Sequence, residues 1–167
     1  MNIVYKNSKH FEERGSLYTV YDDRQMNDLS LNFVQDKISK SYQGVIRGFH
    51  GDDKTWKLIS CLHGRVKLIT YDVERDHKEV YELDAESEES TSILVPPKTL
   101  NAHQCLSSSC IFYYKWSEYY TMPSKQWSVK YNDPDISPCW EQGFHDIISN
   151  RDRESGSLAD LKLKLKG

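Results

Sequence analysis

The feature that most constrains the fold of this chain is a series of short apolar runs from Leu17 to Leu106. The runs are rich in Val, Ile, Leu, Thr and Tyr, and polar, Gly or Pro residues separate them at short intervals. No long helical period extends across them, and runs of this length and composition are typical of β-strands. The pattern therefore predicts an all-β protein, either a sandwich or a jelly roll.

Nine strands are expected from these runs and from one further run that follows them. They are Leu17–Tyr21, Leu31–Ser39, Gly44–His50, Lys57–Leu62, Arg65–Val73, Glu79–Leu83, Thr91–Val95, Ala102–Leu106 and Cys110–Ser117. Between two of them, His63 and Gly64 predict a tight hairpin, because glycine supplies the positive φ that such turns require.

The C-terminal segment has a different character. Ser157–Asp160 resembles a capping box, and Leu158, Leu161 and Leu165 share one helical face. The leucines from Leu161 onward also alternate with lysines, so a C-terminal β-strand is an alternative to the helix. We favour a short helix.

Length and charge limit the classes of function. The 167 residues fit a single domain, 1–167, that is large enough to bury a core. Lys and Arg total 22 against 25 Asp and Glu, which gives no general attraction for polyanions, so we expect no nucleic-acid partner. No apolar run approaches the roughly 18 residues that span a bilayer and no signal segment begins the chain, so we expect no membrane partner. The four cysteines form no C-x-x-C pair, which favours reduced thiols and a cytoplasmic location.

The sequence R-G-F-H, followed by K-L-I, carries residue types that proton abstraction beside a carbonyl requires. Arg47 offers an anion contact, His50 a base with an ordinary pKa of about 6.5, and Lys57 a charge for an oxyanion. On an alternating strand, Arg47 and Phe49 would share one face. Gly48 and His50 would share the other face, so His50 could point into a barrel. A hydrogen-bonded core or surface histidine is the alternative.

Several separated segments resemble, in order, those of the dTDP-4-dehydrorhamnose 3,5-epimerase family, the RmlC-like branch of the cupins. The segments are Glu12–Gly15, Phe33–Ser39, Arg47–His50, Lys57–Ile59, Ala102–His103, Tyr114–Tyr120, Tyr131–Pro134 and Ser149–Asp152. Together they extend over most of the chain. The resemblance implies a cupin-type antiparallel jelly roll with short C-terminal helical segments, and an epimerase.

By this resemblance His50 is the base and Asp152 is its partner, which fixes the imidazole tautomer and stabilises the imidazolium. Lys57 faces the developing oxyanion. Epimerisation also needs a proton donor on the opposite face, because a proton returned to the same face only restores the substrate. Tyr114 matches that donor, and with an ordinary pKa of about 10 it stays protonated at neutral pH. Simple alternation of Phe112–Tyr114 between core and surface is the alternative.

The resemblance also implies substrate contacts. Arg14 and Arg47 match residues that hold a diphosphate, for which the guanidinium fork is suited. Gln35, His103 and Tyr120 match positions that line the sugar site. For the arginines a solvated surface charge is the alternative, and for His103 a core histidine.

No metal or other cofactor is expected. Metal cupins usually place two histidines one residue apart, whereas Phe49 precedes His50, Gly51 follows it, and no H-x-H sequence occurs. Too few N, S or O ligands stand near one another for a metal site. The family implies a homodimer, and a lone jelly roll leaves open edge strands that a partner can cover.

The expected substrate is a nucleotide-linked 4-keto-6-deoxy sugar or heptose, inverted at C3, C5 or both. Thr19 stands where the family commonly has a glutamate that helps to recognise thymine, so GDP is preferred over dTDP. Lys37 replaces an asparagine of the sugar site. Gly51–Thr55 and Asn101–His103 resemble enzymes of capsule synthesis, including those that act on 4-keto heptoses. A 3,4-ketoisomerase and a non-catalytic sugar-nucleotide-binding cupin are the alternatives.

Overall fold

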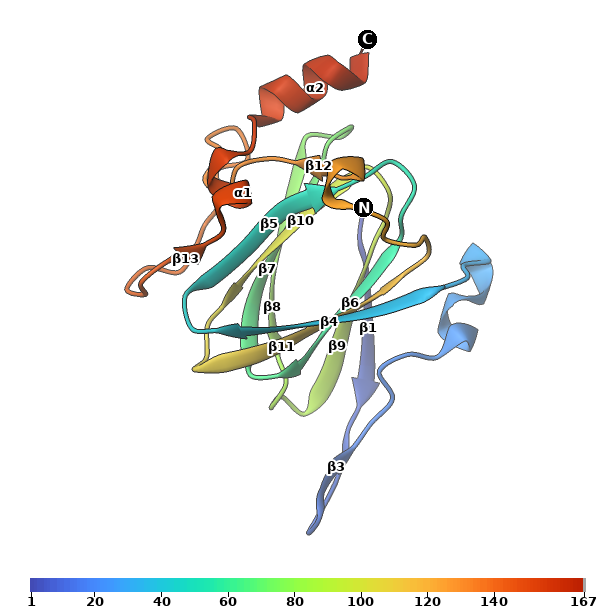
Figure 1. Cartoon of the computed structure of the whole chain (residues 1–167). Coiled ribbons are helices and arrows are strands. Elements are labelled where there is room, and N and C mark those ends of the chain that lie inside the picture. The colour runs from blue at the N-terminus through green and yellow to red at the C-terminus, as the bar shows by residue number, and fades with distance from the viewer. Residues whose placement is uncertain (167) are drawn as a thin grey trace.

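The computed structural model describes residues 1–166, the side chains of Asn27 and Asp28 excepted. Two largely antiparallel sheets face each other across the interior (Figure 1). The first sheet consists, in spatial order, of β1 (Ile3–Ser8), β9 (Glu89–Val95), β6 (Lys57–His63), β11 (Ser109–Trp116) and β4 (Gln35–Tyr42). The second consists of β12 (Trp127–Ser128), β5 (Val45–Gly51), β10 (Thr99–Cys105), β7 (Arg65–Asp72) and β8 (His77–Asp84), with β13 (Ile147–Ile148) parallel to β5. This is the predicted jelly roll.

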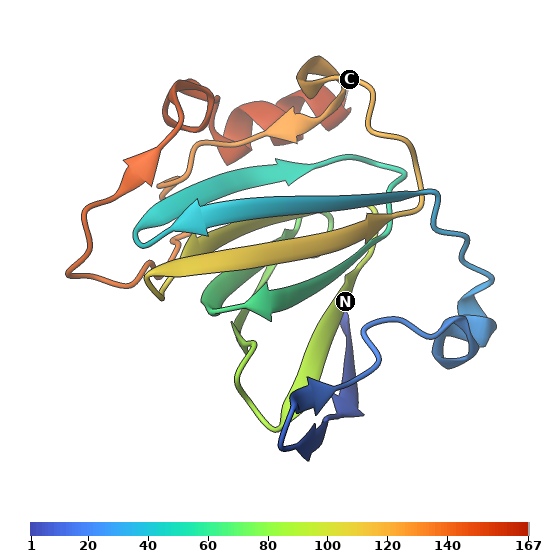
Figure 2. The ribbon, with the colours of Figure 1, turned by 60° about the horizontal axis from the view of Figure 1, so that its bottom comes forward.

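The remaining elements lie outside the two sheets. They are the hairpin of β2 (His10–Glu12) and β3 (Gly15–Leu17), the 3-10 helices η1 (Asp23–Leu29) and η2 (Pro123–Lys125), and the α-helices α1 (Asn150–Glu154) and α2 (Leu158–Lys166). The hairpin extends away from the sheets, and α1 and α2 lie on the side of the second sheet (Figures 1 and 2). None of the helices described within residues 1–166 is long and apolar enough to cross a bilayer.

Side-chain alternation explains why the central strands are apolar on both faces. Ile59 and Ile93 point between the sheets into one buried cluster. Their neighbours Leu58 and Leu94 point outward and pack against Met26 of η1. Each fully buried aliphatic side chain contributes on the order of 2 kcal/mol to folding, so both sides of the first sheet stabilise the fold.

The outer side of the second sheet is covered by the C-terminal segment. Leu158 and Leu161, one helical turn apart on α2, pack in a cluster with Phe49 and Leu100. Leu165 is 47% exposed. The predicted helix is confirmed, because its i, i+3 leucines find an apolar sheet face that a terminal strand would not cover in this way.

The predicted alternation along β5 is wrong. Phe49 is buried in the outer cluster, whereas Arg47 and His50 both line the cavity between the sheets. Asn101 of β10 pairs with His50. The next pair joins His103 to Arg47, so β5 contributes one residue more than β10 between the two pairs. This β-bulge reverses the alternation and brings two cavity residues to positions three apart.

Gly48 occupies the bulge. Its φ is +112°, and a Cβ at this position would lie 2.8 Å from Cβ of Ala102. Only glycine tolerates both the left-handed backbone and the close approach of β10. The small residue in R-G-F-H therefore allows Arg47 and His50 to face the same cavity.

The predicted hairpin at His63 and Gly64 is also wrong. Gly64 has the expected positive φ of +71°, but it joins β6 of the first sheet to β7 of the second. A Cβ on Gly64 would collide with the carbonyl oxygen of Ser109 and the hydroxyl of Ser107. Gly64 therefore lies in a connection from the first sheet to the second rather than in a hairpin.

Two predicted strands near the N-terminus are displaced. In place of Leu17–Tyr21, β3 ends at Leu17 and residues 18–20 lie outside regular strands. In place of Leu31–Ser39, the strand begins at Gln35, because Phe33 packs edge-on against Tyr21 at 5.5 Å outside the first sheet. Strand β1 was not predicted from the sequence. It pairs with β9 over all six of its residues, and local composition does not reveal such a long-range contact.

Candidate active site

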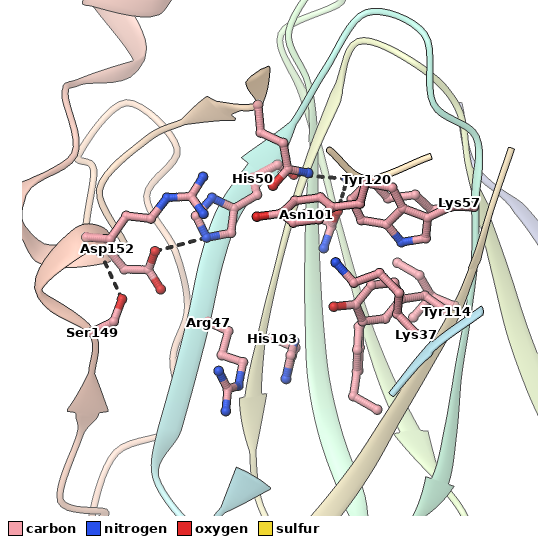
Figure 3. A pocket seen from close by; sticks show the side chains of 15 residues that line it. Lys37, Arg47, His50, Lys57, Asn101, His103, Tyr114, Tyr120, Ser149 and Asp152 are labelled. Atoms are coloured by element: carbon pink, nitrogen blue, oxygen red, sulfur yellow. Dashed lines mark hydrogen bonds and ion pairs between the residues drawn. The ribbon is translucent and has the colours of Figure 1, made fainter. Parts of the chain in front are cut away.

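A polar cavity of about 290 Å³ opens between the two sheets (Figure 3). Most of the predicted site residues line it: Arg47, His50, Lys57, His103, Tyr114, Tyr120 and Asp152. Strands of both sheets and helix α1 thus contribute to one site. Gly167, the last residue of the predicted domain 1–167, lies outside the described residues.

The remaining two predicted residues do not line the cavity. The side chain of Arg14 is 85% exposed at the turn of the β2–β3 hairpin, where Nη2 lies 2.5 Å from Oε1 of Glu12. Gln35 accepts a hydrogen bond from the backbone N–H of Tyr120 at 2.8 Å. Gln35 therefore holds the segment that carries Tyr120, and in this chain Arg14 is remote from the cavity.

His50 and Asp152 form a pair at one side of the cavity. Nε2 of His50 lies 2.9 Å from Oδ1 of Asp152 (Figure 3). The other carboxylate oxygen accepts a hydrogen bond from the N–H of Gly48 at 3.2 Å. Asp152 sits in the first turn of α1, where its own N–H donates to the hydroxyl of Ser149, the N-cap, at 3.2 Å. Burial raises the pKa of Asp152, but the contacts with His50, Gly48 and Ser149 outweigh it and hold this pKa below its ordinary value.

The environment of His50 favours the neutral imidazole. Burial lowers the pKa of His50, and the positive charges of Arg151 and Lys57 act in the same direction. Asp152 opposes them but does not cancel the effect of burial. His50 is therefore available as a proton acceptor at neutral pH.

Lys57 is a buried cation. Its Nζ donates to Oδ1 of Asn101 at 2.9 Å and lies 3.5 Å from the carbonyl oxygen of His50. It also lies 4.9 Å from the centroid of the Trp116 ring, a favourable cation–π arrangement. Burial lowers the pKa of Lys57 to about 8. The ammonium is thus charged at neutral pH and has little solvent to screen it.

Tyr114 lies on β11 of the first sheet, on the other side of the cavity from Asp152 (Figure 3). Its ring packs edge-on against Phe112, with centroids 5.3 Å apart. Burial raises the pKa of Tyr114 above its ordinary value, so the phenol carries its proton at neutral pH. A proton donor and a proton acceptor thus line the same cavity from facing sheets.

Lys37 adds a second lysine to this site. It is the cross-strand neighbour of Tyr114 on β4, and its Nζ lies 3.5 Å from the centroid of the Tyr120 ring. Burial lowers the pKa of Lys37. The cavity therefore combines cations with aromatic rings, which suits an anionic ligand that also has apolar or sugar-ring faces.

His103 is 3% exposed and stacks on Phe112, with ring centroids 3.8 Å apart. Burial, together with the charge of Arg47, lowers the pKa of His103 to about 3. Its Nε2 has no hydrogen-bond partner among the residues that the structure describes. His103 is thus a neutral group with a polar atom that a ligand could satisfy.

Several cavity residues were missed in the sequence, among them Asn101, Trp116, Gln126, Ser149 and Arg151. Alternation along β11 from Tyr114 would have indicated Trp116. The others depend on pairing and packing between distant segments. Among residues 1–166, no three His, Cys, Asp or Glu side chains are grouped so that they could hold a metal ion.

Two facing sheets around a polar cavity define a cupin-type jelly roll, and a histidine–carboxylate pair, a buried lysine and a facing tyrosine line that cavity. The chain belongs to the dTDP-4-dehydrorhamnose 3,5-epimerase family, whose sequence profile matches residues 2–160.

Individual relatives agree with this assignment. The dTDP-4-dehydrorhamnose 3,5-epimerase structure from Elizabethkingia anophelis is 33% identical, covers 95% of this chain and 92% of its own, and superposes with a TM-score of 0.82. The Legionella pneumophila RmlC structure, in complex with dTDP-4-keto-L-rhamnose, is 25% identical, covers 98% and 91%, and has a TM-score of 0.88. The Methanothermobacter thermautotrophicus enzyme is 28% identical over 160 residues, which are 90% of this chain and 86% of the relative.

Proposed function

We propose that this protein inverts C3, C5 or both in a nucleotide-linked 4-keto-6-deoxy sugar or heptose. The observation that carries the proposal is the cavity between the two sheets, with His50 on one sheet and Tyr114 on the other. Inversion requires a proton to leave one face of a carbon and another to arrive on the opposite face. Family membership supports this reaction over the two alternatives.

His50 is the base in this proposal. It removes the proton from the carbon beside the C4 ketone, and Asp152 orients the ring and stabilises the imidazolium that forms. The electrons of the broken C–H bond move into an enolate, whose oxygen Lys57 stabilises. Tyr114 then donates its phenolic proton to the opposite face of the carbon. Burial of these groups makes the charge interactions stronger than they would be in water.

Substrate binding is assigned to the cations and to the polar groups around the sugar. Arg47 contacts the diphosphate, while His103 and Tyr120 contact the sugar, with Gln35 acting through Tyr120. Arg14 is remote from the cavity of its own chain, so its proposed diphosphate contact depends on a second copy in the predicted homodimer. Exposed apolar side chains on the edge strand β4, Ile38 and Tyr42 at 64% each, support such a partner.

The nucleotide is proposed to be GDP, with dTDP as the alternative that the names of the relatives favour. Thr19, the residue behind the preference for GDP, is exposed and lies outside the cavity. A role in cytoplasmic synthesis of a surface polysaccharide such as capsule is part of the same proposal. No metal or redox step is included.

Turnover in D₂O tests the reaction. Incubation of the protein with GDP- or dTDP-linked 4-keto-6-deoxy sugars is expected to place deuterium at C3, C5 or both and to produce the inverted isomer. Movement of the carbonyl from C4 to C3 would favour the ketoisomerase instead. Binding without any exchange would favour the non-catalytic cupin.

A further inference from the structure

The ring of His50 is held at both nitrogens. Nε2 faces Asp152, and Nδ1 lies 3.1 Å from the hydroxyl oxygen of Ser128. Ser128 is the direct cross-strand partner of His50, because β12 pairs with the end of β5. The same hydroxyl accepts a hydrogen bond from Nη2 of Arg151 at 2.8 Å. Two elements that are separate in sequence, β12 and α1, thus meet at the imidazole.

Donor and acceptor chemistry fixes the direction of these hydrogen bonds. An ionised carboxylate only accepts, so the nitrogen facing Asp152 carries the hydrogen. In the neutral ring the other nitrogen then has a lone pair and must receive a hydrogen. A guanidinium only donates, so Arg151 occupies a lone pair of the Ser128 oxygen and leaves the hydroxyl hydrogen free for His50.

We propose that Ser128, held by Arg151, is a positioning residue that fixes neutral His50 in the tautomer with the hydrogen on Nε2 and the lone pair on Nδ1. The four groups form one chain, with hydrogen bonds from Arg151 to Ser128 and from Ser128 to His50 and a 2.9 Å contact between Nε2 of His50 and Oδ1 of Asp152. It begins on a cation and ends on an anion, so the bond dipoles are aligned and support one another.

The role of this chain in catalysis rests on the proposed epimerase function. In the fixed tautomer only Nδ1 can accept the substrate proton, and in the resting protein the Ser128 hydroxyl occupies that atom. Substrate must displace the hydroxyl from Nδ1. Without substrate, protonation of Nδ1 of His50 is disfavoured, because the Ser128 hydroxyl would have to turn its hydrogen away from Nδ1 while Arg151 stays in place.

Charged and titratable groups face His50 from each element packed against it. They are Arg47 on β5, Lys57 on β6, His103 on β10, and Arg151 and Asp152 on α1. All of them are retained in Ser128→Ala, and among their contacts only the hydrogen bond from Arg151 is lost with the hydroxyl. A change in the titration of His50 in Ser128→Ala would therefore report the loss of the Ser128 hydroxyl together with the Arg151 contact that it accepts.

The test is ¹⁵N NMR of the imidazole groups of the full chain without substrate, with the His50 signals assigned by their absence in His50→Asn. In the wild type we expect a single neutral tautomer with the hydrogen on Nε2. In Ser128→Ala we expect a mixture of tautomers and a higher pKa for His50. Ser128→Thr keeps the hydroxyl and should restore the wild-type pattern, and Ser124→Ala, on exposed η2, should not alter it.

Kinetics provide a second measurement. In Ser128→Ala the acid limb of the pH profile for kcat/KM is expected to move to higher pH by about one unit, the shift in pKa that one lost hydrogen bond to the neutral ring corresponds to. An Nδ1-protonated wild-type ring, or a Ser128→Ala ring with unchanged tautomer and pKa, would overturn the proposal. Because the NMR measurement needs no turnover, absence of epimerase activity would leave its result valid, and failure of the NMR test would leave the proposed reaction untouched.

Discussion

The carboxylate of Asp152 contacts the ring of His50 while it also accepts a hydrogen bond from the backbone of the strand that carries His50. The first distance is 2.9 Å, and the second, from the N–H of Gly48, is 3.2 Å. The carboxylate is therefore fixed relative to the imidazole by two contacts to β5. The pair forms only because α1 is placed beside the second sheet.

Asp152→Asn should lower kcat/KM by roughly 10²- to 10⁴-fold, the range that general acid–base catalysis contributes. Loss of the carboxylate also removes the contact that raises the pKa of His50. The acid limb of the pH–rate profile should therefore move to lower pH. Asp146→Asn, a change of the same kind at an exposed position, is the control. Wild-type activity in Asp152→Asn would refute the role given to this pair.

The lowered pKa of Lys57 predicts that kcat falls at alkaline pH. Since its pKa is lowered to about 8, the ammonium is lost as the pH rises through that value, and with the role proposed for Lys57 at the enolate kcat should fall with it. Lys57→Met should cost roughly 10²- to 10³-fold in kcat, as removal of an oxyanion contact does elsewhere. The exposed Lys54→Met is the matched control. An alkaline limb absent up to pH 10 would contradict the assignment.

The lowered pKa of His103 predicts that the folded protein loses stability as the pH falls. Its pKa is about 3 in the folded chain and about 6.5 when unfolded. Between these values the unfolded state binds more protons at His103 than the folded state does. The free energy of unfolding is therefore unaffected by His103 above pH 6.5 and declines as the pH falls from 6.5 toward 3. The decline is about 1.4 kcal/mol of unfolding free energy per pH unit.

Urea unfolding at several pH values between 7 and 4.5 measures this effect. The dependence should be weaker in His103→Gln, which cannot take up a proton, than in the wild type. His77→Gln, at an exposed position, should retain the wild-type dependence. Equal slopes for His103→Gln and the wild type would mean that protonation of other groups accounts for the acid sensitivity.

The nucleotide is tested by ligand-induced stabilisation. A ligand that binds only the folded state stabilises it by RT ln(1 + [L]/Kd), so at equal concentration the tighter ligand raises the unfolding temperature more. GDP should therefore raise it more than dTDP at equal concentration. Arg47→Gln should reduce the shift for both nucleotides, since the diphosphate is common to them. A larger shift with dTDP would refute the preference drawn from Thr19.

The sequence predicted those strands and helices whose local apolar pattern matches the faces that are buried in the fold. Val, Ile and Leu runs predicted the central strands because β6 and β9 are buried on both faces, as Leu58 and Ile59 illustrate. The leucine spacing predicted α2 because Leu158 and Leu161 cover one face of the second sheet. The seven predicted residues that line the cavity followed mainly from the resemblance to the family rather than from spacing.

The parts that sequence reasoning missed depend on contacts between distant segments. A one-residue bulge in β5 reverses the side of Arg47 relative to Phe49, and nothing in R-G-F-H alone shows that β10 is one residue shorter there. Ser128 meets His50 only through the two-residue pairing of β12 with β5. A β-strand this short has no sequence pattern of its own.

Deuterium exchange by two variants tests the central claim, that His50 and Tyr114 act on opposite faces of one carbon. In D₂O, Tyr114→Phe should still exchange the C3 or C5 hydrogen with retention of configuration, because the base returns deuterium to the face from which it took the proton. His50→Asn should neither exchange nor invert. Exchange at the wild-type rate in His50→Asn, or full inversion by Tyr114→Phe, would contradict the account.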